Sequence, residues 1–231
     1  MRVIGAALFA LIASSAAAET ITAARYISPT GRYAHGILGD ALEWGGLQLS
    51  LADGSARRFD LPRDHVFEDI APRLADVTGD GAPEVLVIET DVNHGAALAI
   101  YGPEGKITET PHIGQSNRWL APLGAADLDD DGAIEIAYVD RPHLARVLRV
   151  WRFASGSLSE VAQMEGLTNH RIGEQYISGG IRDCGGVPEV VLADGSWKRV
   201  VGVTLDAGKL TQRDIGPFEG RKSFAAALAC E

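Results

Sequence analysis

The sequence lacks long stretches in which apolar residues recur at helical spacing. Short apolar runs alternate instead with turn-like clusters that contain many of its 27 glycines. This pattern is typical of short strands joined by turns, since glycine adopts the backbone angles that tight turns require. We therefore expect an all-β protein and exclude folds built mainly from helices.

Basic residues are also scarce. The chain has 21 lysines and arginines against 31 aspartates and glutamates, which gives a net charge of −10. A surface this acidic disfavours nucleic acid as a partner, because the phosphate backbone is itself negatively charged. We expect a monomer whose partner is a protein or an anionic ligand that meets a local basic region.

No stretch beyond the first 18 residues is apolar enough to cross a bilayer. The opening itself has Arg2, a short apolar run over residues 3–13 and small residues that end at Ala18. This order predicts a secretory signal peptide at residues 1–18, because a membrane span needs a longer apolar run. The remaining chain, 19–231, is expected to form one exported domain, either periplasmic or extracellular.

Common enzyme motifs are absent too. The sequence has no G-x-S-x-G, no H-E-x-x-H and no glycine loop of the kind that holds phosphates. Asp129 and Asp131 could form a general acid–base pair, but their spacing within an acidic loop favours metal ligation. We expect a non-enzymatic binding module. The alternatives are a hydrolase or lyase for an anionic saccharide or ester, and a subunit that docks onto a larger exported complex.

There are only two cysteines, Cys184 and Cys230. In an oxidising compartment such a pair is expected to form a disulfide. Two free thiols are the alternative, in which case Cys184 would be a weak candidate for a nucleophile.

Two segments, 76–84 and 127–135, carry side-chain oxygens at positions 1, 3, 5 and 9 and a glycine at position 6. This spacing is typical of loops that wrap calcium, which prefers six to eight oxygen ligands. A solvated acidic turn is the alternative, and the lack of flanking helices excludes an EF-hand. The second loop has one more carboxylate, so we expect tighter binding there. The predicted side-chain ligands are Asp76, Thr78, Asp80 and Glu84 in the first loop, and Asp127, Asp129, Asp131 and Glu135 in the second.

Four glycines, Gly54, Gly105, Gly156 and Gly208, recur at intervals of 51, 51 and 52 residues. Strand-like runs flank each glycine, so we predict four repeats near 20–62, 63–114, 115–166 and 167–231. Four units of four antiparallel strands predict a small β-propeller of about four blades. Residues 223–229 are expected to add a strand that closes the ring, with the disulfide clipping this closure. Residues 20–27 compete for the same position.

The segments ADVTGDGAPEVLVIETD and AADLDDDGAIEIAYVD resemble the FG-GAP and VCBS-type repeats of integrin-like propellers. The resemblance implies calcium in both loops, with the carbonyls of Ala82 and Ala133 as further ligands. The chain departs from the family pattern in having Glu at position 9 and the uncharged Thr78. It is too short for the integrin propeller, and the four-bladed hemopexin-like ring, also closed by a disulfide, is nearer in size.

The face opposite the acidic loops is expected to collect basic and aromatic residues. Guanidinium groups suit carboxylate or phosphate, and an aromatic ring could stack on a sugar or a cation. We therefore predict a pocket for an anionic ligand or an acidic partner segment. Ordinary solvated loops and a histidine metal centre are the alternatives. The candidate residues are His65, Arg118, Trp119, Arg141, His143, His170 and Arg171.

Overall fold

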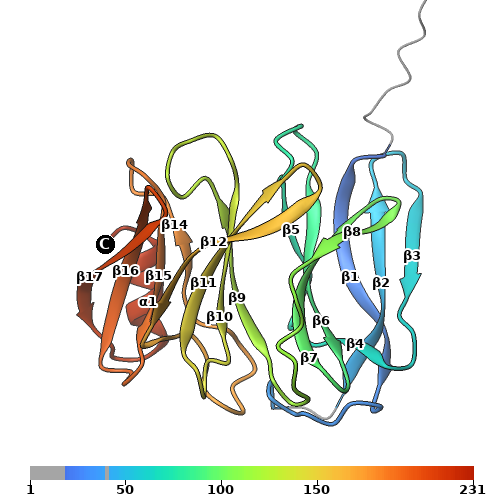
Figure 1. Ribbon diagram of the computed structural model, residues 1–231, viewed down its shortest axis with the longest axis horizontal. Coiled ribbons are helices and arrows are strands. Elements are labelled where there is room, and N and C mark those ends of the chain that lie inside the picture. Colours follow the sequence, from blue (N-terminus) through green and yellow to red (C-terminus); the bar gives the residue numbers. More distant parts are fainter. Residues whose placement is uncertain (1–18, 40–41) are drawn as a thin grey trace, which may run out of the picture.

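The computed structural model describes residues 19–39 and 42–231, which form three antiparallel sheets standing side by side and one short helix (Figure 1). The expected all-β class is confirmed. The predicted signal peptide, residues 1–18, lies outside the described residues. In the described part of the chain, no helix is long and apolar enough to span a membrane.

The largest sheet has eight strands and consists of two units joined by β4. Its order is β1-β2-β4-β6-β7-β8, with β3 paired to β2 and β5 paired to β6. The joint is narrow: Trp44 of β2 pairs with Phe67 of β4, and Phe67 in turn pairs with Glu89 of β6. The strands are β1 (Ile21–Thr30), β2 (Glu43–Leu51), β3 (Ala56–Asp60), β4 (His65–Phe67), β5 (Arg73–Ala75), β6 (Glu84–Asp91), β7 (Gly95–Gly102) and β8 (Gly105–Glu109).

The other two sheets are single units. The four-stranded sheet is a meander in the order β12-β11-β10-β9, and the five-stranded sheet runs β13-β15-β16-β17 with β14 also paired to β15. Their strands are β9 (Leu120–Ala126), β10 (Glu135–Asp140), β11 (Val147–Ala154), β12 (Ser157–Glu165), β13 (Leu167–Thr168), β14 (Gly180–Arg182), β15 (Glu189–Asp194), β16 (Arg199–Asp206) and β17 (Lys209–Pro217).

The four evenly spaced glycines lie at equivalent turns. They lie in the hairpins β2–β3, β7–β8, β11–β12 and β16–β17. All four have positive φ, from 76° at Gly208 to 129° at Gly105. Side chains other than glycine rarely adopt these angles, which explains why the residue recurs at this turn. Each unit thus contains one such hairpin.

The first strand of each later unit is interrupted at the same level. In the third unit the interruption is a bulge at Leu123, because Gly124 pairs with Ala137 whereas Pro122 pairs with Tyr138. In the second unit residues 68–72 separate β4 from β5, and in the fourth unit residues 169–179 separate β13 from β14. The separating segments of the second and fourth units contain buried polar side chains.

Apolar layers hold neighbouring units together. One buried cluster lies between the first and second units, a second between the second and third, and a third between the third and fourth. No strand pairing among residues 19–39 and 42–231 joins the first unit to the fourth. Those two units meet through loops, where the N–H of Gly173 donates to the carbonyl of Ile37 at 3.2 Å.

The C-terminal segment was expected to be a strand, and this prediction was wrong. It forms the helix α1 (Arg221–Leu228), whose Phe224 and Ala227 are buried against strands of the fourth unit. Alanine and leucine have the highest helix propensities, and residues three apart share one face of a helix. The alanine-rich run therefore suits a helix at least as well as a buried strand. Of the competing segment 20–27, residues 21–27 belong to β1 and pair with β2.

The predicted disulfide is confirmed, but its expected role is not. Cys184 and Cys230 are bonded, with their Cα atoms 5.8 Å apart. Cys184 precedes β15 and Cys230 follows α1, so the bond fastens the helix to its own unit. The disulfide therefore does not clip two neighbouring units together.

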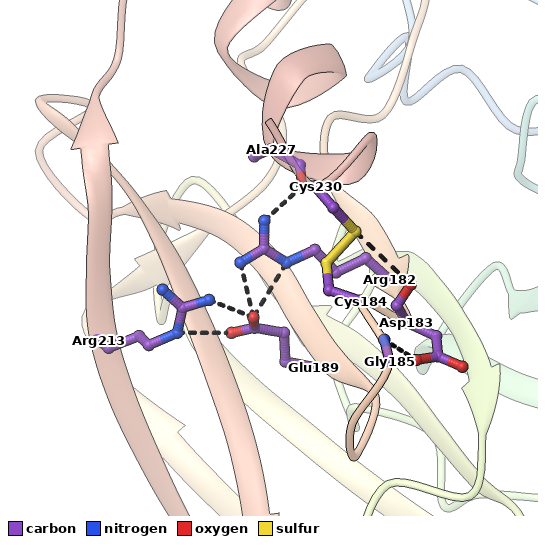
Figure 2. Close-up of a disulfide and its surroundings, with 8 residues drawn as sticks. All are labelled: Arg182, Asp183, Cys184, Gly185, Glu189, Arg213, Ala227 and Cys230. Atoms are coloured by element: carbon purple, nitrogen blue, oxygen red, sulfur yellow. Dashed lines mark hydrogen bonds and ion pairs between the residues drawn. A yellow bond between two sulfur atoms is a disulfide. The ribbon is translucent and has the colours of Figure 1, made fainter.

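A buried arginine reinforces this attachment (Figure 2). The guanidinium of Arg182 donates to the carbonyl of Ala227 at the end of α1. It also donates to Oε1 of Glu189, from Nε at 3.0 Å and from Nη2 at 2.6 Å. Arg213 contacts the same carboxylate from β17, with Nε 3.1 Å from Oε2. Glu189 is only 7 % exposed, so these guanidinium groups compensate a buried charge.

Replacing both cysteines by alanine should lower the free energy of unfolding. The 46-residue separation between them predicts a loss of about 4 kcal/mol, because the unfolded chain gains freedom. Urea unfolding of the double variant and the oxidised wild type measures the difference. Equal stability would show that the helix is held without the bond.

The stability due to Glu189 should depend on pH. Burial raises its pKa, but Arg213 and Arg182 lower it more, so the folded-state pKa lies below the ordinary value of 4.5. The stabilisation is fully present above the unfolded-state pKa of about 4.5. It is lost as the pH falls below that value and through the lower pKa of the folded state. The stability gap between the wild type and Glu189→Gln should therefore narrow below about pH 4.5 in urea unfolding. A gap that is constant down to about pH 3 would contradict this assignment.

Candidate functional site

The two acidic loops occupy equivalent places in the second and third units. Segment 76–84 connects β5 to β6, and segment 127–135 connects β9 to β10. Gly81 and Gly132, at position 6 of each loop, have φ of 88° and 87°. A side chain would be strained at these angles, so the glycines permit the sharp turn that the spacing predicted.

The 127–135 loop gathers its carboxylates closely. Ligand atoms of Asp127, Asp129 and Glu135 all lie within 4.8 Å of one another, the only such trio of acidic, histidine or cysteine side chains in the described part of the chain. Asp127 fixes the turn by accepting N–H groups from Asp131 at 3.1 Å and Gly132 at 2.8 Å. Oδ1 of Asp129 is buried and has no hydrogen-bond partner.

Glu135 anchors this loop to the sheet. The side chain is fully buried, and its Oε2 accepts the N–H of Leu128 at 2.9 Å. Burial raises the pKa of Glu135 above its ordinary value. A buried carboxylate and a neighbouring unpartnered oxygen suit a hard cation with oxygen ligands, so the residues of this loop fit calcium.

Arg152 is a member of this site that the sequence analysis missed. It lies on β11 directly opposite Glu135 of β10. Its nitrogens contact three carboxylates of the loop: Nε to Oε1 of Glu135 at 2.6 Å, Nη2 to Oδ2 of Asp129 at 2.8 Å, and Nη1 to Oδ2 of Asp131 at 2.9 Å. The carboxylates of this loop are therefore already in contact with a positive charge, supplied by the neighbouring strand β11.

The 76–84 loop has the same turn, but its carboxylates have different hydrogen-bond partners. Asp76 accepts N–H groups from Gly79 at 2.7 Å and Gly81 at 2.8 Å. Oε2 of Glu84 accepts the N–H of Val77 at 3.0 Å, and Oε1 accepts the hydroxyl of Thr78 at 3.3 Å. Burial raises the pKa of Glu84. The acidic oxygens of this loop do not form a trio as close as that of the second loop.

Ala82 and Ala133, whose carbonyls were expected as additional ligands, lie in corresponding turns. Their N–H groups donate to the carboxylates of Asp80 at 2.8 Å and Asp131 at 2.9 Å. These bonds hold the position-5 carboxylates against the backbone two residues later, as in an Asx turn.

Several of the predicted basic and aromatic residues meet at one cleft of about 270 Å³. Arg118, Trp119, Arg141 and His143 line it, together with His35, which the sequence analysis did not single out. Trp119 is only 2 % exposed, and its Nε1 donates to the carbonyl of Glu68 at 2.7 Å. Its ring is thus part of the wall and is not a free stacking platform, contrary to expectation.

His143 and His170 are joined by a hydrogen bond whose donor can be assigned. Nε2 of His170 lies 2.8 Å from the carbonyl of Glu174 and must donate to it, so Nδ1 of His170 accepts from Nε2 of His143 at 3.0 Å. Nδ1 of His143 is then the unprotonated nitrogen. Burial, and next the proximity of His170, lowers the pKa of His143 to about 4. The pair is therefore uncharged near neutral pH.

A buried carboxylate supports the third histidine of this region. Nδ1 of His35 lies 2.5 Å from Oε1 of Glu68, and Oε2 of Glu68 accepts the hydroxyl of Thr90 at 2.7 Å. Glu68 is fully buried, and burial raises its pKa above the ordinary value. His35 and Glu68 are 33 residues apart, and no spacing in the sequence marks them as partners.

Three predicted members of the basic face lie outside the cleft lining: His170, which pairs with His143, and the two residues His65 and Arg171. His65 contacts Asp64 at 3.1 Å and packs edge-on against His112. The guanidinium of Arg171 lies over the rings of Trp197 at 4.3 Å and Phe218 at 4.9 Å, a cation–π arrangement in the fourth unit. The predicted face therefore contains one cleft and two separate contacts.

The comparison with protein families gives one match. The model described as an FG-GAP-like repeat matches residues 76–138, a range that contains both acidic loops. No curated protein matches the chain. The matched range begins at the first residue of the first loop and ends within β10, just after the second loop. The chain thus contains an FG-GAP-like repeat at residues 76–138.

Proposed function

We propose that the protein is an exported, non-enzymatic interaction module in which calcium braces the 127–135 loop. The observation that carries this proposal is the close trio of Asp127, Asp129 and Glu135, with a buried oxygen of Asp129 that has no partner. Bound calcium would supply positive charge to this loop. The chain's own residues do the rest: Asp127 holds the turn, and Glu135 ties the loop to β10.

The 76–84 loop is proposed as a second, weaker calcium site. It has one fewer carboxylate, and its acidic oxygens are less closely gathered. The two sites lie on the same side of adjacent units, each before the second strand of its unit. Calcium there would stiffen the ends of the units without taking part in any reaction.

The proposal includes export and a propeller-type arrangement. A disulfide is typical of proteins that fold in an oxidising compartment, which supports a periplasmic or extracellular location. The four hairpin units pack face to face as propeller blades do, although they meet at the first and fourth units through loops. We therefore propose a four-bladed arrangement in which the first and fourth blades meet without strand pairing among the described residues.

The cleft beside His35 favours a second candidate function, the binding of a small anion with an apolar body. The chain has a net charge of −10, yet among residues 19–39 and 42–231 no carboxylate lines this cleft. Within the described residues Arg118 forms no ion pair, and its guanidinium donates a hydrogen bond only to the carbonyl of Asn117, at 2.8 Å. Apolar walls are supplied by Ile37, Leu144 and Ile172.

The rival activity, hydrolysis or elimination on an anionic saccharide or ester, would use the same cleft. A histidine oriented by a buried carboxylate can act as a general base, and His35 with Glu68 has this arrangement. Turnover that disappears in His35→Gln while ligand binding persists would favour the enzyme. Binding without turnover agrees with the interaction module.

Calcium should raise the melting temperature of the wild type. Extracellular sites often have dissociation constants of about 10⁻⁴–10⁻³ M, so about 10 mM calcium should contribute roughly 1.4–2.7 kcal/mol. For a chain of this size the melting temperature should rise by about 3–10 °C. Differential scanning calorimetry with and without chelator measures the rise.

Asp129→Asn combined with Asp131→Asn should abolish most of this rise, because two ligands lose their charge. Asp206→Asn, a change at an exposed residue at the end of β16, is the matched control and should keep it. A melting temperature that is indifferent to calcium in the wild type would refute calcium bracing.

The cleft prediction uses phenylacetate as the probe and phenylacetamide as its uncharged counterpart. Saturation-transfer NMR should show binding of the anion, at least tenfold weaker binding in Arg118→Gln, and little change in Arg25→Gln on the exposed surface of β1. The charge-assisted contact to a guanidinium accounts for the difference. Equal binding of the amide and the anion would contradict an anion site.

A further inference from the structure

We infer that Arg152 is a resident cation of the 127–135 loop and that calcium must compete with it, so that this arginine sets the calcium affinity of the loop. The inference rests on the calcium binding proposed above. It assigns a role to a residue that lies outside the acidic segment and outside residues 76–138, where the family match ends.

The contacts of Arg152 occupy oxygens that calcium would need. Each of its three guanidinium nitrogens contacts a different carboxylate, at 2.6–2.9 Å. Two of these carboxylates, those of Asp129 and Glu135, belong to the close trio. Carboxylate oxygens that accept hydrogen bonds from a guanidinium cannot give the same lone pairs to a metal ion. Calcium and the fully engaged guanidinium are therefore competitors.

Strand register explains why only this loop has such a cation. Antiparallel pairing of β10 with β11 sets Arg152 directly opposite Glu135. In the second unit, the register that pairs Val85 with Tyr101 sets Glu84 opposite Gly102, which has no side chain. No basic side chain among the described residues forms an ion pair with Glu84. The 76–84 loop is therefore free of an internal competitor.

In the fourth unit, arginines take the place of most acidic residues around the corresponding glutamate. Glu189 occupies the same position at the start of its strand, but the preceding segment has lost the acidic residues of positions 1 and 5. Two guanidinium groups, from Arg182 and Arg213, contact Glu189 instead (Figure 2). The buried glutamate at this position is thus compensated in three ways. Glu84 of the second unit has no arginine partner among the described residues, and Glu135 of the third unit has one arginine beside acidic ligands. Glu189 of the fourth unit has two arginines and few acidic neighbours.

A consequence for the metal-free protein follows. Arg152 offsets repulsion among the carboxylates, so the 127–135 loop keeps its turn in the absence of calcium. Removing the guanidinium should release Oδ2 of Asp129 and Oε1 of Glu135 for a metal ion while leaving the acidic cluster uncompensated. Calcium affinity should then rise, and stability without calcium should fall.

The test is isothermal titration with calcium, in chains where Asp76→Asn and Asp80→Asn silence the first loop. In this background the Arg152→Gln chain should bind calcium at least tenfold more tightly than the chain that retains Arg152. Arg152→Lys, which keeps the charge but loses the fork of donors, should be intermediate. Arg149→Gln is the matched control: Arg149 lies on the same strand but pairs with Asp140 and Glu160, and its loss should leave the affinity unchanged.

Melting curves add a readout that does not depend on binding heat. Arg152→Gln should melt at a lower temperature than the parent in chelator and should gain more from calcium. If Arg152 instead positions the ligands, Arg152→Gln will bind calcium more weakly, and this result would overturn the inference. Calcium binding that is equal in the two chains would overturn it as well.

The two proposals fail in distinguishable ways. Calcium binding by the Arg152 chain without any gain in Arg152→Gln contradicts only the competition. Absence of binding in every chain, including the one with both loops intact, contradicts the proposed calcium bracing together with the inference that rests on it. Binding only in Arg152→Gln supports the competition and shows that the guanidinium normally holds the loop closed to the metal.

Discussion

The structure depends on compensating one buried carboxylate in each of three units. Glu84, Glu135 and Glu189 begin β6, β10 and β15 and are only 8 %, 0 % and 7 % exposed. An uncompensated charge at such a depth would cost several kcal/mol, so each glutamate must have partners. Backbone N–H groups of the preceding loop supply some of them in the second and third units, which couples the loop to the sheet. Arginines supply the rest in the third and fourth units. The chemistry of each loop follows from how its glutamate is compensated.

The arrangement of the units gives the molecule two different ends. Apolar layers join successive units, and the last unit covers its remaining apolar face with α1, which the disulfide and Arg182 hold in place. The first unit presents polar residues on β1 and β2, such as Arg25, which donates to Gln48. Between these ends, the first strands of the second and fourth units are interrupted, and Glu68 and His170 from these segments contact His35 and His143 of the cleft. The acidic loops and the cleft thus arise from different parts of the same repeat.

The sequence predicted what depends on neighbouring residues or on a single possible pairing, such as the hairpin glycines, the turns of the acidic loops and the bond between the two cysteines. It did not predict contacts that depend on strand register. Arg152 is 17 residues from Glu135 and meets it only because β10 and β11 align in one way. His35 and Glu68 meet because the first strand of the second unit is interrupted at one point. Residues 223–229 were misread because a short run of alanine and leucine is compatible with either a helix or a buried strand.

The most direct test of calcium in the 127–135 loop is the amide spectrum of the protein during a calcium titration. The N–H of Gly132 donates to Asp127 at 2.8 Å, so a metal ion on that carboxylate must change its environment. If calcium binds this loop, the Gly132 resonance should shift and saturate, while that of Gly156, in the hairpin of the same unit, should stay in place. A Gly132 resonance that does not move, or moves only as much as Gly156, would contradict the central claim.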